Sequence, residues 1–217
     1  MPQPRPRVIL VTDPVFGDDG IVRCVEAVAR ALPPGALCVQ LRDKQRALVS
    51  LRVFASRLRL VTRSLGAALV INGDPRLARD VGADGVHLGR GAGSAAAARA
   101  MCGAGAWVSV SAHTDGAVRR AVADGADAAL VSPVFPSRPP SVYADSKEGR
   151  GLEALRSARR VAGAALQLFA LGGVDADNTR ACAQAGADGV AVVRALLASP
   201  EPARVARAMH DALGGRC

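Results

Sequence analysis

Two glycines and an arginine near the end of the chain have the chemistry of a phosphate site. Gly172 and Gly173 directly follow an apolar run, and adjacent glycines allow the backbone to approach a ligand closely. Arg194 follows the next apolar run, where a helix with free N–H groups would begin and attract an anion. The segments LGGVDADN (171–178) and VVRAL (192–196) therefore predict a phosphate-binding cup.

Polar side chains also follow the other apolar runs of the sequence. They carry amide, hydroxyl, carboxyl, imidazole and cationic groups, all of which can bind a polar ligand. In chain order they are Thr12, Asp13, Gln40, Arg42, Asp43, Lys44, Asn72, Asp74, His87, Arg90, Ser109, Ser111 and His113. A general base could come from either histidine. For both, a structural hydrogen-bonding role is the simpler interpretation.

The elements that must position these groups alternate along the chain. Short, nearly continuous apolar runs are typical of parallel strands that are buried on both faces. The runs are 8–11, 37–41, 68–71, 85–88, 107–110, 128–131, 166–171 and 189–193. Stretches with helical spacing lie between most of them, for example 22–32, 48–65, 117–123, 154–161 and 203–213. The pattern predicts strand and helix in alternation.

One junction between helix and strand occurs three times. The segments DVGADGVHL (80–88), ADGADAALV (123–131) and QAGADGVAVV (184–193) each place a glycine at a helix end, then an Asp, then an apolar strand. Repeated strand–helix pairs favour a closed (β/α)8 TIM barrel of class α/β. The alternative, an open doubly wound sheet, normally carries a GxGxxG fingerprint, which VTDPVFGDDG (11–20) lacks. In a barrel, the polar groups that follow the strands converge on one rim.

Length and composition bound the class of protein. A chain of 217 residues suits a single domain, and we expect the barrel to span 8–217 after a flexible tail at 1–7. The net charge of +9 is spread over separate helices, and 3% aromatic residues give no stacking platform, so we expect no nucleic-acid partner. We also expect no membrane span and a cytoplasmic location, with the five cysteines as reduced thiols.

Seven motifs in register resemble one family. They are QLRDK (40–44), LVING (69–73), GADGVHLG (82–89), VSAHT (110–114), PVFPS (133–137), ALGGVDADN (170–178) and AGADGVAVVRAL (185–196). Their order and spacing resemble the thiamine phosphate synthase and thiazole tautomerase superfamily, from about Val8 to Leu213.

The resemblance implies a transferase that joins hydroxymethylpyrimidine diphosphate to hydroxyethylthiazole phosphate, giving thiamine phosphate and pyrophosphate. In such a synthase, Mg2+ and cationic groups draw off pyrophosphate, and the thiazole nitrogen captures the remaining pyrimidine cation. Catalysis then depends on charge stabilisation and positioning. Carried over by position, Gln40, Arg42 and Lys44 contact the pyrimidine or its diphosphate, Asn72 and Ser111 line the site, and Gly173, Val193 and Arg194 hold the thiazole phosphate.

The polar segment 131–151 would be the family's pyrophosphate loop, since a loop of about 17 residues in a compact domain is usually functional. The synthase pattern after Pro-Phe is Thr-x-Thr-Lys, whereas this sequence has Ser137-Arg138-Pro139-Pro140. Ser137 preserves a hydroxyl, Arg138 can replace a cationic anion donor, and Lys147 can supply the lysine. The resemblance thus predicts catalytic roles for Lys44, Ser111, Ser137 and Lys147. It predicts substrate-binding roles for Gln40, Arg42, Asn72, Arg138, Gly172, Gly173, Val193 and Arg194.

The sequence departs from the synthase pattern at the metal. The resemblance places Mg2+ carboxylates where this chain has Gly73 and Ala92, which leaves Asp74 as a weak candidate ligand. Two alternatives therefore stay open. One is a thiazole tautomerase-like isomerase without Mg2+, although its proton-transfer His lies where this chain has Pro133. The other is a noncatalytic homologue that binds phosphorylated ligands.

Overall fold

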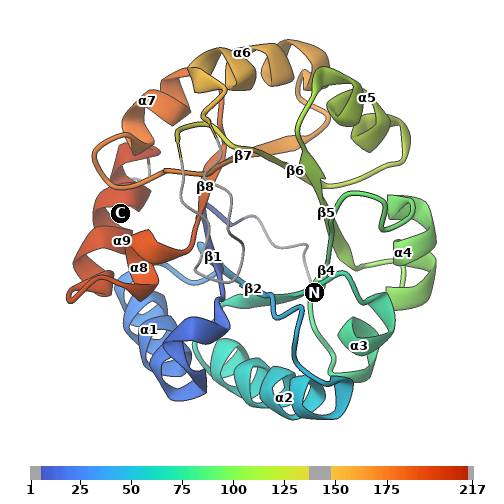
Figure 1. The fold of residues 1–217 in the computed structure, drawn as a ribbon, viewed down its shortest axis with the longest axis vertical. Helices are drawn as coiled ribbons and strands as arrows, with labels where there is room; N and C mark the ends of the chain where they lie inside the picture. The colour runs from blue at the N-terminus through green and yellow to red at the C-terminus, as the bar shows by residue number, and fades with distance from the viewer. Residues whose placement is uncertain (1–5, 137–147, 215–217) are drawn as a thin grey trace.

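The barrel is closed by parallel strands that pair in chain order, β8 returning to β1 (Figure 1). The computed structural model describes residues 6–136 and 148–214. The strands are β1 (Val8–Val11), β2 (Leu37–Leu41), β3 (Ala68–Asn72), β4 (Gly85–Leu88), β5 (Trp107–Ala112), β6 (Ala128–Val131), β7 (Gln167–Leu171) and β8 (Gly189–Val192). The predicted (β/α)8 barrel is confirmed.

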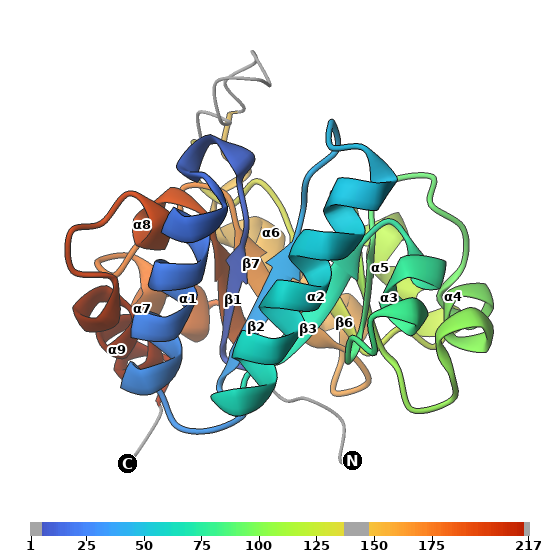
Figure 2. The same ribbon diagram turned by 90° about the horizontal axis from the view of Figure 1, so that it is seen from below.

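Helices form the outer ring (Figure 1). They are η1 (Pro14–Phe16), α1 (Asp18–Ala31), α2 (Leu48–Ser64), α3 (Pro75–Asp80), α4 (Ala95–Cys102), α5 (Asp115–Ala123), α6 (Gly151–Ala162), α7 (Thr179–Gln184), α8 (Arg194–Leu197) and α9 (Pro202–Ala212). Side-chain oxygens of Asp13, Asp74, Ser94 and Thr114 cap the first turns of η1, α3, α4 and α5. In Figure 2 the chain rises through the strands and descends through the helices. No helix in the described ranges is both long and apolar enough to cross a membrane.

Alternation along each strand divides the core into two clusters. The inner cluster fills the barrel and contains Ile9, Val11, Cys38, Ala68, Val70, Trp107, Ala128, Leu130, Phe169 and Ala191. The outer cluster packs the strands against the helices. Successive strand residues point to opposite faces. The inner series of β1 to β5 therefore continues, at the carboxyl ends, to Asp13, Gln40, Asn72, His87 and Ser111. The fold alone brings these polar groups to one rim.

The repeated junction is an Arg–Asp clasp at the amino ends of the strands. Each Asp accepts a hydrogen bond from the backbone of the preceding odd-numbered strand and pairs with an arginine of an even-numbered helix. The three sets of Asp, backbone donor and Arg are Asp84, Leu69 and Arg59; Asp127, Val108 and Arg99; and Asp188, Leu168 and Arg159. At Asp127, Oδ2 lies 2.6 Å from Val108 N and 3.0 Å from Arg99 Nη2. The junction motif is therefore structural.

Removing one clasp is expected to destabilise the barrel. We expect Asp127→Ala to lower the free energy of unfolding by about 2–4 kcal/mol, because a partly buried guanidinium and a strand N–H lose their charged acceptor. Urea unfolding followed by circular dichroism measures the loss. Glu153→Ala is the control, since Glu153 pairs with Arg160 on the exposed surface of α6, where such pairs contribute little. Equal urea midpoints for the two variants would contradict a structural role for the clasp.

The amino end of the chain packs earlier than predicted. Residues 1–5 of the predicted flexible tail lie outside the described ranges, but Pro6 is buried. Arg7 N donates to Ala36 O at 2.9 Å, Val190 N donates to Arg7 O at 2.9 Å, and the Arg7 guanidinium donates to Leu213 O. Contacts with the barrel therefore begin before β1, because the hydrogen bonds of Arg7 extend the ladder beyond the apolar run and Pro6 is buried.

Candidate active site

Gln40 and Asn72, both predicted to bind substrate, form a hydrogen bond at the carboxyl ends of β2 and β3. Asn72 Nδ2 donates to Gln40 Oε1 at 3.2 Å. Gln40 is only 2% exposed, and its Nε2 is buried without a hydrogen-bond partner in the described part of the chain. An unpartnered buried donor is costly. A ligand acceptor at this point would satisfy it.

Arg42 follows Gln40 on the same strand end, and its backbone is held by the neighbouring strand. Thr12 Oγ1 accepts from Arg42 N at 2.9 Å and donates to Arg42 O at 3.3 Å. The positive charge of Arg42 acts on buried His87, whose pKa it helps to lower. Arg42 therefore adds positive charge near the polar rim. Lys44 lies two residues further and is exposed.

Arg46 clamps the turn that carries Lys44, a role that the sequence analysis missed. Its Nε donates to Asp43 Oδ2 at 2.8 Å, and its two terminal nitrogens donate to Asp18 at 2.8 and 2.6 Å. The guanidinium also lies over the Phe54 ring, 4.8 Å from the centroid. Hydrogen bonds from Arg46 hold the pKa of the Asp18 carboxyl below its ordinary value. The Asp-x-x-Arg spacing of 43 and 46 was the available signal.

We expect Arg46→Ala to lower kcat/KM about tenfold, because misplacing a positioning turn by a fraction of an ångström is costly in catalysis. Steady-state kinetics measures this effect. Arg57→Ala is the matched control: Arg57, in α2, also pairs with a carboxylate of α1, Asp19, at 2.7 Å, but both side chains are well exposed. The clamp has no role in catalysis if both variants keep wild-type kcat/KM.

His87 joins two serines across β4 and β5. Its Nδ1 lies 2.9 Å from Ser109 Oγ and its Nε2 lies 3.0 Å from Ser111 Oγ. Burial, and then the positive charge of Arg42, lower the pKa of His87 to about 4. The imidazole is therefore neutral at pH 7, with both ring nitrogens engaged.

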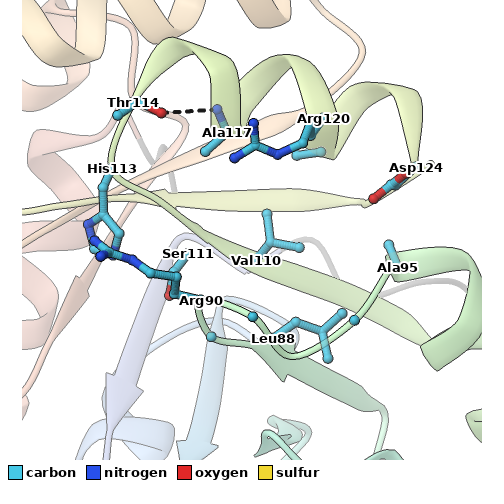
Figure 3. Close-up of a pocket in the computed structure, with 14 residues that line it drawn as sticks. Leu88, Arg90, Ala95, Val110, Ser111, His113, Thr114, Ala117, Arg120 and Asp124 are labelled. Atoms are coloured by element: carbon cyan, nitrogen blue, oxygen red, sulfur yellow. Dashed lines mark hydrogen bonds between the residues drawn. The ribbon is translucent and has the colours of Figure 1, made fainter.

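A cavity of about 410 Å³ opens beside Ser111, between the carboxyl end of β4, β5 and α5 (Figure 3). Leu88, Val110 and Ala95 give it apolar walls, and Arg90 and Arg120 also line it. In Figure 3 the Arg120 guanidinium extends along α5 toward Ala117. Asp124 lines the cavity too, so its charged side chains carry one positive charge in excess beside the apolar walls, which suits a small anionic ligand with an apolar part.

His113, which also lines this cavity, ties β5 to the segment after β6. Its Nδ1 lies 2.8 Å from Ser132 O, so the Nδ1 proton is donated to that carbonyl. The geometry agrees with the structural role expected for His113.

The glycine pair after β7 lies against the segment that follows β6. Val134 N donates to Leu171 O at 2.9 Å and Phe135 N donates to Gly172 O at 3.0 Å. Gly172 and Gly173 have φ of 96° and 62°, and a Cβ on Gly173 would lie 2.6 Å from Pro136 O. Close backbone packing therefore accounts for both glycines. Their predicted phosphate contacts stay a prediction.

The remaining predicted residues fall in two places. Val193 is the N-cap of α8 and Arg194 its exposed first residue, so a helix does begin where the phosphate cup was predicted. Ser137, Arg138 and Lys147 lie outside the described residues. The two ends of their loop are joined, since Arg150 N donates to Pro133 O at 3.0 Å and Gly151 N to Val134 O at 2.8 Å.

The described residues do not fit a magnesium ion held by protein carboxylates. Asp74, the weak candidate ligand, accepts a hydrogen bond from Leu77 N at 2.9 Å and caps α3. Gly73 and Ala92 carry no ligand atom in their side chains. Within the described ranges no three His, Cys, Asp or Glu side chains come together as a metal site. The amides of Gln40 and Asn72 and the guanidinium of Arg42 suit an anion rather than a hard cation. Asp13 adds a carboxylate to the same rim, and its Oδ2 is buried without a partner among the described residues.

A closed (β/α)8 barrel with polar groups gathered at the carboxyl ends of its strands is the architecture of an enzyme that acts on small molecules. The sequence model of the family described as thiamine monophosphate synthase matches residues 8–196. The chain belongs to this family.

Individual relatives agree with this assignment. The chain is 42% identical over 185 residues to a thiamine-phosphate synthase of Halorhodospira halophila, covering 84% of this chain and 85% of the relative. It is 38% identical over 182 residues to a putative thiamine-phosphate synthase of Geobacter sulfurreducens, covering 84% and 83%. The structure of a thiamine phosphate pyrophosphorylase from Pyrococcus furiosus superposes with a TM-score of 0.81 over 96% of this chain and 95% of that one. At 22% identity this last likeness supports the fold.

Proposed function

We propose that the protein is a thiamine-phosphate synthase, a transferase that joins hydroxymethylpyrimidine diphosphate to hydroxyethylthiazole phosphate. The family match and the identities of 38–42% to proteins of that name support this function. The geometric observation that carries it is the group at the ends of β2 and β3. There, Gln40 accepts a hydrogen bond from Asn72 through Oε1, its buried Nε2 has no partner within the described residues, and Arg42 follows on the same strand end.

The reaction requires positive charge beside the leaving pyrophosphate and a fixed orientation of the two substrates. The C–O bond between the pyrimidine methylene and the diphosphate breaks, pyrophosphate leaves with the electron pair, and the thiazole nitrogen forms the new C–N bond. Arg42 and Lys44 would stabilise the negative charge that grows on the leaving group. Gln40 and Asn72 would hold the pyrimidine by hydrogen bonds, so that the methylene faces the thiazole nitrogen.

The thiazole phosphate belongs at the other side of the rim in this proposal. Gly173, Val193 and Arg194 would bind it, and Ser137, Arg138 and Lys147 would contact the pyrophosphate from the loop. The substrates are phosphorylated and do not cross membranes freely, so we place the reaction in the cytoplasm.

His87 argues against the isomerase alternative. A tautomerase needs a residue that moves a proton, but His87 has both ring nitrogens engaged and a pKa lowered to about 4. His113 donates its Nδ1 proton to Ser132 O. His87 is therefore not set up as the principal base, whereas the Nε2 of His113 stays an acceptor, so conversion of thiazole carboxylate phosphate is the assay that decides the isomerase alternative.

The test is formation of thiamine phosphate from the two purified substrates, detected by mass spectrometry, with Mg2+ and with EDTA. Product supports the proposal. Mg2+ enters the proposal only as a partner of the diphosphate, and activity that survives EDTA would show that the cationic side chains suffice. If the folded protein binds thiazole phosphate but forms no product under either condition, the function is a different one. Conversion of thiazole carboxylate phosphate would then indicate the isomerase, and binding alone the noncatalytic homologue.

A further inference from the structure

The chain Ser109–His87–Ser111 runs from the closed interior of the barrel to the cavity beside β5. His87 and Ser109 are register partners on β4 and β5. Ser109 is 0% exposed and His87 3% exposed, whereas Ser111 is partly exposed and lines the cavity. The inner end of the chain is therefore sealed from solvent, while its outer end meets the ligand space.

The direction of the two hydrogen bonds follows from the sealed end. His87 Nδ1, at 2.9 Å, is the partner of the Ser109 hydroxyl within the described residues. If Nδ1 carried the ring proton, Ser109 would accept that bond, and its own hydroxyl hydrogen would be buried without an acceptor among the described residues. Native proteins avoid a buried donor without an acceptor more strictly than an unused lone pair. If Ser109 donates instead, Nδ1 accepts and the ring proton must lie on Nε2.

We propose that His87 is a positioning residue: it carries its ring proton on Nε2, donates it to Ser111 Oγ, and so turns the Ser111 hydroxyl into a hydrogen-bond donor toward the cavity. The ligand atom that meets Ser111 is then an acceptor, of the class of a phosphate oxyanion. Arg90, on the same cavity, supplies the matching charge. The pKa of His87, lowered to about 4, keeps this arrangement in the neutral state of the ring at physiological pH. The identity of the ligand rests on the proposed function, but the tautomer does not.

The tautomer can be measured directly in the intact protein. The chain has three histidines, so two-bond 1H–15N correlation spectra of 15N-histidine-labelled protein at pH 7 are simple, and His87→Gln assigns the His87 signals. We expect the pattern of a neutral ring protonated at Nε2. A ring protonated at Nδ1 would overturn the proposal.

The second part of the proposal, the hydrogen bond from Ser111 to a phosphate oxyanion (the ligand half), is tested by isothermal titration calorimetry. Inorganic pyrophosphate is titrated into wild type and variants. Ser111→Ala is expected to weaken binding about tenfold, the size of one charge-assisted hydrogen bond. His87→Leu should weaken it similarly, with no further loss in the double variant, because the two residues act as one unit. His87→Gln, which can accept from Ser109 and donate to Ser111, should restore binding to within about threefold.

Unchanged pyrophosphate affinity in folded His87→Leu or Ser111→Ala would overturn the ligand half. If His87→Leu does not fold, Ser111→Ala and the wild-type tautomer still decide. Wild-type protein that binds no pyrophosphate would contradict the proposed function as well. In that case the tautomer measurement still tests His87 on its own.

Discussion

Replacing Arg42 with alanine is expected to lower kcat/KM for thiamine phosphate formation by about 10²–10³-fold, the usual effect of removing one preorganised charged donor from a transition state. The backbone of Arg42 is fixed by Thr12 through two hydrogen bonds, so the strand end that carries the side chain is held in place. Steady-state kinetics under the conditions that give wild-type product measures the effect.

Two controls separate charge from geometry at Arg42. Arg42→Lys keeps the charge but loses the two-pronged donor, so its kcat/KM should lie between wild type and Arg42→Ala. Arg63→Ala removes an exposed arginine from the end of α2 and should leave kcat/KM unchanged. The pKa of His87 should rise in Arg42→Ala, because the repelling charge is gone. Activity of Arg42→Ala within threefold of wild type would remove Arg42 from the reaction.

Gly85→Ala is expected to prevent the barrel from folding stably, with a loss of more than about 4 kcal/mol. A Cβ on Gly85 would lie 1.8 Å from Trp107 O and 2.7 Å from Trp107 C. Both atoms belong to the backbone of β5, which pairs with β4 at this register. The strands would have to separate to make room, because neither atom can rotate away. Soluble yield and urea unfolding measure the effect.

Gly20→Ala is the control for Gly85→Ala. Gly20 lies in the first turn of α1, and a Cβ there meets nothing within 4 Å. Alanine should stabilise the protein by about 0.5–1 kcal/mol, because it restricts the unfolded chain and favours the helix. A Gly85→Ala protein as stable as wild type would show that β4 and β5 can shift apart at little cost.

The strands could be predicted almost to the residue, because burial on both faces leaves little ambiguity in an apolar run. The ladder extends beyond the runs at the ends of β3 and β5, where Asn72 and Ser111 are polar but still paired. A hydropathy pattern does not detect polar residues at the end of a strand. Helix α1 begins at Asp18, four residues before the predicted start, because its first turn is polar and exposed.

Residue type and strand position were enough to predict that Gln40, Asn72 and Ser111 lie at one rim, while their contacts with a ligand stay predictions. The site was not predictable where two loops meet. The packing of Gly173 against Pro136 and the reach of Arg46 to Asp18 depend on which loops are neighbours in space. The positions of Ser137 and Lys147 stay predictions.

The three Arg–Asp clasps also bear on how the barrel assembles during folding. They join residues 25, 28 and 29 positions apart, so each closes a chain segment of nearly the same short length at nearly the same entropic cost. Each clasp joins a helix to the amino end of the second strand after it, as Arg59 of α2 joins Asp84 before β4. A clasp can therefore form as soon as the chain between its Arg and its Asp has collapsed. Short sequence separations of this kind favour rapid folding. Each repeated Asp can thus stabilise its own pair of neighbouring strands and the helix between them before β8 pairs with β1 and the barrel closes.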